Sequence, residues 1–386
     1  MAHLSEIARE FLKLGATAFG GPAMMGVMQS ELQEKRQWVS KERFLEGVSL
    51  ANVLPGPSMT QLSIFLGYAR GGWWGGLLAG LCFVIPGFLI VLALAFAYAA
   101  LGASPILRGA VHGLGPVVLG IYLVAVFRLG RTAVRGALHA ALALAAGAVA
   151  SFSPLGVASI ILLAGGTGVL LFYSRRIGAA VIVVLVAILA LLHFLTAAIG
   201  GSQSPPPAQA AGLGYLAAML FKIGAFTFGG GLSMIAFIEE QVVLQLHWLT
   251  PQEFIDGLAL GQLTQGPILV IAAYVGLKVM GIAGAVVGTT AAFLPAFVMM
   301  LTILPMFERG RNMPWTRAAM GGIGPAVVGL LAVSLTRLAP HAVPDPFAFA
   351  VLITTIVVLA LWRVGPFTVL LAGGALGVLR KAYAWR

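Results

Sequence analysis

The chain of 386 residues is 60% hydrophobic and only 9% charged, with a mean hydropathy of +1.01, whereas a soluble domain has roughly 25% charged residues. Its net charge of +11 is carried by Lys and Arg in short loops between apolar runs, the pattern that orients a membrane protein, so we expect no nucleic-acid partner. The single cysteine, Cys82, lies inside an apolar run, which excludes a disulfide framework and disfavours redox chemistry. Because the apolar runs lack the alternation of barrel strands, the composition predicts an all-α polytopic membrane protein.

The N-terminal part of the chain is predicted to form short helices separated by glycine and proline breaks. Apolar side chains share one face of residues 3–14, which predicts an amphipathic helix at the membrane interface. The glycines and proline of 20–22 interrupt this helix, which resumes at 24–33. A charged segment follows at 31–46, and after a further short helix the sequence Pro-Gly-Pro at 55–57 forms a second break.

Apolar runs long enough to cross a bilayer follow, since about 20 apolar residues are needed for one helical crossing. After a short apolar piece that ends at Arg70, the predicted spans of the first half are 73–101, 105–129, 136–152, 154–173 and 177–199. Residues 200–211 carry no charge and contain three consecutive prolines, which is the composition of a linker. We therefore predict an N-terminal repeat at 1–199, a linker at 200–211, and a C-terminal repeat at 212–386 with one span fewer.

The two halves share a sequence repeat. The stretch FLKLGATAFGGP at 11–22 returns as LFKIGAFTFGGG at 220–231, with Lys13 and Lys222 in register 209 positions apart. The register continues, because Trp, Phe, Gly and Gly-Pro positions of 38–57 return 210 positions later, and the Gly-Pro pair at 115–116 returns 209 positions later. Glycine and proline in register over such a length are hard to attribute to shared hydrophobicity, so we predict a common structure for the halves.

The distribution of charge predicts that the two repeats are inserted in opposite directions. The segment 31–46 is rich in Lys and Arg, whereas its counterpart at 239–256 has acidic residues and no Lys or Arg. Conversely, three arginines at 309–317 follow a span whose counterpart ends in a loop with only Arg108. We therefore expect inverted-topology repeats with discontinuous, broken or re-entrant helices. One feature disagrees with this topology. Counting the spans onward from Arg317 places the basic residues near the C-terminus outside the cell.

Broken helices in a membrane protein point to an anion site. A broken helix leaves backbone N–H groups unpaired, and its N-terminus carries about half a positive charge. Half-helix ends and two lysines, arranged by pseudo-symmetry, would hold a compact oxyanion. The predicted substrate-binding residues, all at or near the breaks, are Lys13, Thr17, Phe19, Gly20, Gly21, Pro22, Asn52, Gly56, Pro57, Ser58, Lys222, Thr227, Phe228, Gly229, Gly230, Gly231, Gln262, Gln265, Gly266 and Pro267.

Several of these residues have an alternative role that the sequence leaves open. The glycines can simply allow close packing of helices. Lys13 can extend the polar stripe of the first helix and reach lipid headgroups, whereas Lys222 is a lone cation in an apolar stretch and therefore a functional candidate by default. Asn52 and Gln262, at equivalent positions, can donate to a substrate oxygen or to a neighbouring helix.

Chemistry other than transport has little support in the sequence. The six histidines are scattered with no pair at ligand spacing, and no HExxH, Walker A or GxSxG motif occurs. We therefore expect no metal, no cofactor and no enzymatic activity. A membrane-embedded enzyme would need an acid/base pair or an activated nucleophile inside the spans, and the acidic residues of the second half fall in its polar segment instead.

The FGGP and FGGG copies, the Asn-x-x-Pro-Gly-Pro and Gln-x-x-Gln-Gly-Pro breaks and the Gly-Pro pairs resemble the chromate ion transporter family in its long two-domain form. The resemblance covers essentially the whole chain and implies a bacterial inner-membrane exporter of chromate that gives chromate resistance. Export would be driven by the membrane potential or a proton gradient. The implied partners are a chromate- or sulfate-type oxyanion and the lipid bilayer, and the sequence leaves a homodimer open. The alternative is a transporter or exchanger of sulfate or another anion. In the second copy Gly231 replaces Pro22 and Gln265 replaces Pro55, so the two half-sites are not strictly equivalent.

Overall fold

The computed structural model is helical, with no strand among the residues it describes. Those residues are 2–17, 21–101, 104–153, 155–199, 212–228, 231–264, 267–307, 314–362 and 364–383. Within this part of the chain, the stretches long and apolar enough to cross a membrane are Ser58–Ala100, Gly109–Ala133, Ile268–Thr302 and Pro314–Ala342. The all-α class predicted from the sequence is confirmed, and the predicted linker at 200–211 lies outside the described residues.

The helices fall into two series that follow one another along the chain. The first series is α1 (Ala2–Thr17), α2 (Gly21–Met28), the π-helix η1 (Gln29–Lys35), α3 (Lys41–Val53), α4 (Ser58–Leu101), α5 (Pro105–Ala133), α6 (Ala137–Phe152), α7 (Val157–Phe172) and α8 (Arg175–Ile199). The second is α9 (Leu213–Ala225), α10 (Met234–Ile238), the π-helix η2 (Glu239–Gln245), α11 (Pro251–Leu263), the 3-10 turn η3 (Ile268–Val270), α12 (Ile271–Phe307), α13 (Pro314–Ala342), α14 (Pro346–Leu361) and α15 (Pro366–Tyr383). Members at the same place in each series have equal lengths: 13 residues for α3 and α11, 29 for α5 and α13, and 16 for α6 and α14.

The short helices before each long apolar stretch begin at side-chain caps. Ser40 precedes α3, and its hydroxyl accepts a hydrogen bond from the backbone N–H of Arg43 at 3.2 Å. Thr250 precedes α11 and forms a capping box with Glu253, and Pro251 occupies the first helical turn. Such caps satisfy N–H groups that the helix itself leaves unpaired, so local sequence sets where each helix starts.

The long helices α4 and α12 each contain a sharp reversal near their start. Gly71 and Gly72 in α4 have φ/ψ of −139°/22° and 62°/−155°, and Met280 and Gly281 in α12 have −139°/23° and 65°/−154°. A Cβ on Gly67 would overlap the carbonyl oxygen of Gly75, although residues eight apart in a straight helix are separated by about 12 Å. The chain therefore folds back at each kink, and α4 consists of a short helix, 58–70, followed by a long one.

The two series interlock, because helices of each pack on helices of the other. α1 packs on α4 and α9 packs on α12, but α5 packs on α14 and α15, while α13 packs on α6 and α7. Close approach depends on glycine: a Cβ on Gly322 of α13 would overlap the carbonyl oxygen of Ala164 on α7, and one on Gly113 of α5 would overlap the carbonyl oxygen of Gly373 on α15.

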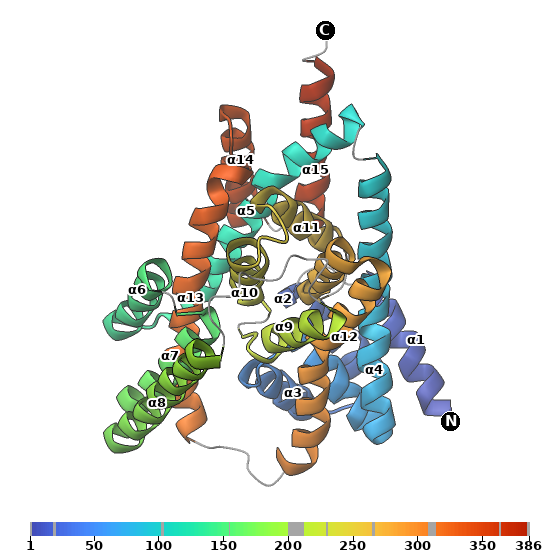
Figure 1. Cartoon of the computed structure of the whole chain (residues 1–386). Coiled ribbons are helices and arrows are strands. Elements are labelled where there is room, and N and C mark those ends of the chain that lie inside the picture. The colour runs from blue at the N-terminus through green and yellow to red at the C-terminus, as the bar shows by residue number, and fades with distance from the viewer. Residues whose placement is uncertain are drawn as a thin grey trace.

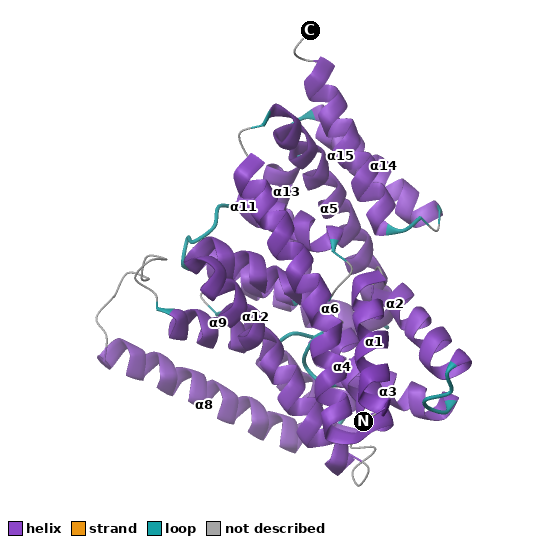
Figure 2. Cartoon of the chain, turned by 90° about the vertical axis from the view of Figure 1, so that its right-hand side faces the viewer, coloured by secondary structure: helices purple, strands orange, loops and turns teal. Residues whose placement is uncertain are grey.

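The long helices of the two series run in opposite directions. In Figure 1, α4 runs upward from blue to cyan, whereas α12 runs downward from gold to orange, so the two long helices point in opposite directions. Helix α8 packs on α7 and lies along the outer edge of the molecule in Figure 2. The short helices α9, α10 and α11 lie in the middle of Figure 1, with α3 below them.

Candidate anion site at the helix breaks

The break between α3 and α4 lies against the break that follows α9. Gly56 donates its backbone N–H to the carbonyl oxygen of Thr227 at 2.6 Å, which joins two segments far apart in the sequence. Gly56 has φ of 132°, in the region that favours glycine, and a Cβ there would lie 2.6 Å from Nε2 of Gln61. That Nε2 donates to the carbonyl oxygen of Pro55 at 2.7 Å. The space beside the Cα atom of Gly56 is therefore too small for a Cβ atom, and only glycine fits at this position.

Polar side chains follow this break at the start of α4, although the region is buried. Ser58 is 3% exposed, and Thr60, Gln61 and Ser63 are fully buried. The hydroxyl of Ser63 donates to the carbonyl oxygen of Met59 at 2.8 Å, but Oγ1 of Thr60 and Oε1 of Gln61 have no hydrogen-bond partner. An unpaired buried polar atom costs about 1–3 kcal/mol, so such atoms are expected where a ligand or water completes a site.

The break after α9 is held by Ser233. Its Oγ accepts a hydrogen bond from the N–H of Phe228 at 2.6 Å and donates to the carbonyl oxygen of the same residue at 2.9 Å. The hydroxyl of Thr227 donates to the carbonyl oxygen of Ile223 at 2.6 Å, so the carbonyl of Thr227 is the group that reaches the other break. Gly231, with φ of 98°, completes the turn before α10.

The two predicted lysines lie outside this buried contact. Lys13 on α1 and Lys222 on α9 both have exposed side chains. The charge of Lys13 interacts with Glu31 on η1, and that of Lys222 interacts with Glu240 on η2. Each cation therefore interacts with a carboxylate of the π-helix in its own series.

The two predicted carboxamides have different environments. Gln262 on α11 is half-buried, and its Nε2 donates to the hydroxyl of Tyr122 on α5 at 2.8 Å. The sequence left open whether Gln262 donates to a substrate oxygen or to a neighbouring helix. This hydrogen bond is of the second kind. Asn52, near the end of α3, has an exposed side chain.

The remaining predicted residues are placed as follows. The hydroxyl of Thr17 donates to the carbonyl oxygen of Lys13 at 2.7 Å, Gly21 and Pro22 begin α2, and Pro267 is buried before η3. The predicted residues outside the described part of the chain are Phe19, Gly20, Gly229, Gly230, Gln265 and Gly266. Of the predicted set, the structure brings together Gly56, Pro57 and Ser58 on one side and Thr227 and Phe228 on the other.

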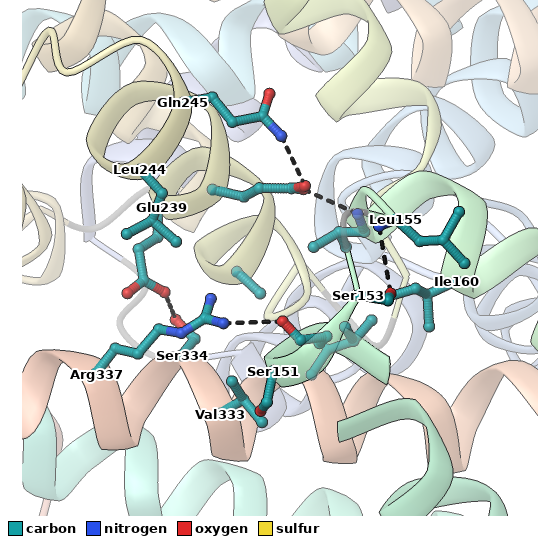
Figure 3. A pocket seen from close by; sticks show the side chains of 15 residues that line it. Ser151, Ser153, Leu155, Ile160, Glu239, Leu244, Gln245, Val333, Ser334 and Arg337 are labelled. Atoms are coloured by element: carbon teal, nitrogen blue, oxygen red, sulfur yellow. Dashed lines mark hydrogen bonds between the residues drawn. The ribbon is translucent and has the colours of Figure 1, made fainter. Parts of the chain in front are cut away.

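A separate pocket of 220 Å³ lies where η2, α13 and the loop between α6 and α7 meet. Glu239, at the start of η2, is 2% exposed and accepts a hydrogen bond from the hydroxyl of Ser334 on α13. Figure 3 shows both residues beside Arg337, whose Nη2 donates to the carbonyl oxygen of Ala150 at the end of α6 at 2.9 Å. Oε2 of Glu240 accepts from the N–H of Val157, the first residue of α7, at 2.9 Å.

The sequence reasoning missed the buried residues Thr60 and Glu239 as site candidates. Thr60 lies one turn into an apolar helix, and its only signal is a polar side chain close after the Pro-Gly-Pro break. Glu239 falls in the polar segment that was predicted to lie outside the spans. The sequence does mark this position by a difference between the two repeats. Glu239 and Glu240 of the second repeat correspond to the uncharged residues Gln29 and Ser30 of the first, 210 positions earlier.

Comparisons with known proteins agree with one another. The family model described as chromate transporter matches residues 5–201 and 214–378. A probable chromate transport protein of Synechococcus elongatus is 32% identical over 364 residues, covering 94% of this chain and 91% of that protein. The chromate transport protein of Cupriavidus metallidurans is 30% identical over 376 residues, covering 97% and 92%, and that of Pseudomonas aeruginosa is 30% identical over 341 residues, covering 86% and 80%. No solved structure matches the chain.

Proposed function

The chain belongs to the chromate transporter family, and on that premise we propose that it is a secondary transporter that exports chromate, a tetrahedral divalent oxyanion. The family and the apolar helices make it a multi-pass membrane protein of the bacterial plasma membrane. Under the proposal, export lowers the internal chromate concentration and gives chromate resistance. Relatives named as chromate transport proteins over most of the chain support the substrate.

The proposed scaffold is a pair of inverted repeats, 1–199 and 212–386, with discontinuous helices. Its support is the pairing of equal helices and the near-identical backbone angles at Gly72 and Gly281, together with the opposite directions of α4 and α12 in Figure 1. The piece 58–70 is about 20 Å long, too short for a hydrocarbon core of about 30 Å. A half-helix of this kind ends inside the membrane, where transporters of inverted-repeat architecture bind their substrates.

The observation that carries the proposed site is the hydrogen bond from Gly56 to Thr227, which joins the two helix breaks. Directly after Gly56 comes the N-terminus of α4, with its positive end and the unpaired hydroxyl of Thr60. Ser58 adds a second buried hydroxyl. These donors would bind the oxygens of the anion. Lys13 and Lys222, which are exposed, would attract it to the entrance by their charge.

The energetics favour outward movement of a dianion. An inside-negative potential drives each negative charge outward by about 2.3 kcal/mol per 100 mV, so a dianion gains roughly twice that amount. Export therefore needs no nucleotide hydrolysis, and a potential-driven or proton-coupled mechanism is sufficient.

The test is transport of radiolabelled chromate in inside-out and right-side-out membrane vesicles, with and without an imposed potential, and with sulfate as competitor. We expect chromate to move toward the original external face when the potential is applied, and sulfate to compete. Chromate movement in the opposite direction would refute export. Sulfate flux without chromate flux would replace the substrate and leave the break site as the anion site.

A further inference from the structure

The pocket at Glu239 has no part in the anion site proposed above, although it contains one of the few buried carboxylates in the described chain. We propose that this pocket is a proton-binding site, in which Glu239 takes up and releases one proton per transport cycle and so couples a proton gradient to anion transport. The inference rests on the proposed transport function and names the residue that would provide its coupling.

The geometry of the pocket suits a carboxyl group that changes its protonation state. Glu239 is 2% exposed yet borders a pocket of 220 Å³, so it is shielded from bulk water but has space beside it for proton transfer. Its hydrogen bond comes from the hydroxyl of Ser334, a group that can donate to a carboxylate or accept from a carboxylic acid. The hydroxyl side chains of Ser151 and Ser153 also line the pocket.

The charged groups around Glu239 come from three elements. Glu240 is its neighbour on η2, Arg337 lies on α13, and Lys222 on α9 acts on Glu240. The described residues of α6, α7 and α10 that line the pocket are uncharged. The pocket thus holds two carboxylates beside one guanidinium, which disfavours an anion, and the described residues contain no cluster of His, Cys, Asp or Glu that could hold a metal.

The electrostatics place the titration of Glu239 in the physiological range. η2 lies outside the candidate membrane spans. Burial raises the pKa of Glu239 to about 7, and the negative charge of Glu240 adds to this increase. The hydrogen bond from Ser334 and the positive charge of Arg337 lower the pKa but do not cancel the effect of burial. A group that titrates near neutral pH can load and release protons across a modest gradient.

Protonation of Glu239 would act on helices that lead to the anion site. The Glu239–Ser334 hydrogen bond ties η2 to α13, while neighbouring bonds tie Glu240 to the start of α7 and Arg337 to the end of α6. Along the chain, only the five-residue helix α10 and residues 228–233 separate η2 from Thr227. A change of charge at Glu239 therefore alters the contact of η2 with α13, and η2 lies close along the chain to the proposed anion site.

The first series has neither the carboxylate nor the hydroxyl of this pair. At the positions equivalent to Glu239 and Ser334 in the sequence repeat stand Gln29 and Ala125. Glu239→Gln therefore places at the site the side chain that the other series has at the same position, and it keeps the size of the group while removing its charge. The matched control is Glu34→Gln, since Glu34 is an exposed carboxylate on η1.

The experiment uses the full chain reconstituted in vesicles, with two measurements of labelled chromate. One is accumulation driven by a pH gradient while potassium and valinomycin hold the potential at zero. The other is isotope exchange with equal chromate and equal pH on both sides, which requires no net proton movement. For Glu239→Gln we expect gradient-driven accumulation to fall to background and exchange to persist. Glu34→Gln should match the wild type, and Glu239→Asp should recover a response to the gradient.

The outcomes separate the inference from the function on which it rests. Gradient-driven accumulation by Glu239→Gln equal to that of the wild type overturns the proton site. Loss of exchange together with accumulation also overturns it, because the residue would then serve folding or anion binding. A wild type that exchanges chromate and responds to potential but not to a pH gradient overturns the coupling and leaves the transporter. A wild type with no chromate flux of any kind refutes the proposed function itself.

Discussion

Replacement of Gly56 by alanine tests whether the break between α3 and α4 is the tightly built centre of the anion site. An alanine would have to adopt φ of 132°, a backbone conformation whose strain costs about 1–3 kcal/mol. Its Cβ would lie 2.6 Å from Nε2 of Gln61 and 3.2 Å from the Cβ of Ala296. Gln61 must then move and lose its hydrogen bond to Pro55, worth about 0.5–1.5 kcal/mol. We expect Gly56→Ala to destabilise the protein by about 2–4 kcal/mol in total.

The assay compares the thermal unfolding temperature of the purified protein, followed by intrinsic tryptophan fluorescence, with chromate exchange in vesicles. Gly136→Ala is the matched control, because Gly136 has extended backbone with φ of 176° and a Cβ there would meet nothing within 4 Å. Gly56→Ala should unfold at a lower temperature than the control and lose exchange even below its unfolding temperature. Wild-type unfolding and exchange in Gly56→Ala would refute the close packing of the break and its role in transport.

Further predictions concern the lysine, a close helix contact and a surface ion pair. Lys222→Ala should reduce chromate flux strongly at normal abundance in the membrane, and undiminished flux would remove Lys222 from the transport path. Gly224→Ala should lower the unfolding temperature, because its Cβ would overlap the backbone carbonyl of Ala292 where α9 packs on α12; unchanged unfolding would show that the helices can separate without cost. Burial opposes ionisation of Asp345, but hydrogen bonds, including one from Arg380 at 2.7 Å, outweigh it and hold the pKa of this carboxyl at about 2. Because the folded pKa lies below that of the unfolded chain, this group stabilises the protein above about pH 4 and the contribution is lost as the pH falls toward 2. Asp345→Asn should therefore unfold at a lower temperature than the wild type at pH 6, with the difference disappearing near pH 2; a difference independent of pH would contradict the linkage.

Local features of the fold were predictable because local residues cause them. The end of a short apolar piece at Arg70 and the start of a span at residue 73 were predicted on either side of a glycine pair, and the structure has its reversal at Gly71 and Gly72. Predicted helices at 136–152 and 177–199 agree with α6 and α8 within two residues, because the length of the apolar run sets where such a helix begins and ends. The breaks around Gly56 were likewise visible as proline and glycine in the sequence.

Contacts between distant segments were not predictable from one sequence. The exchange of partners, with α5 on α14 and α15 and α13 on α6 and α7, depends on which small residues face each other, and many apolar helices carry such residues. The same limit applies to the site. The repeat predicted that both breaks matter, but only the structure places Gly56 against Thr227, separates the lysines from that contact and buries Glu239.

The interlocked packing has a consequence for how the protein is made. Gly168 of α7 packs against Gly322 of α13. The ribosome adds Gly322 154 residues after Gly168. Synthesis proceeds at about 5–20 residues per second, so α6 and α7 are in the bilayer for on the order of 10–30 s before α13 has been synthesised. During that interval their small-residue faces are open to lipid or to quality-control proteases. Biogenesis of the first half therefore depends on completion of the second, and a chain truncated before α13 should be degraded rather than stored as a half-transporter.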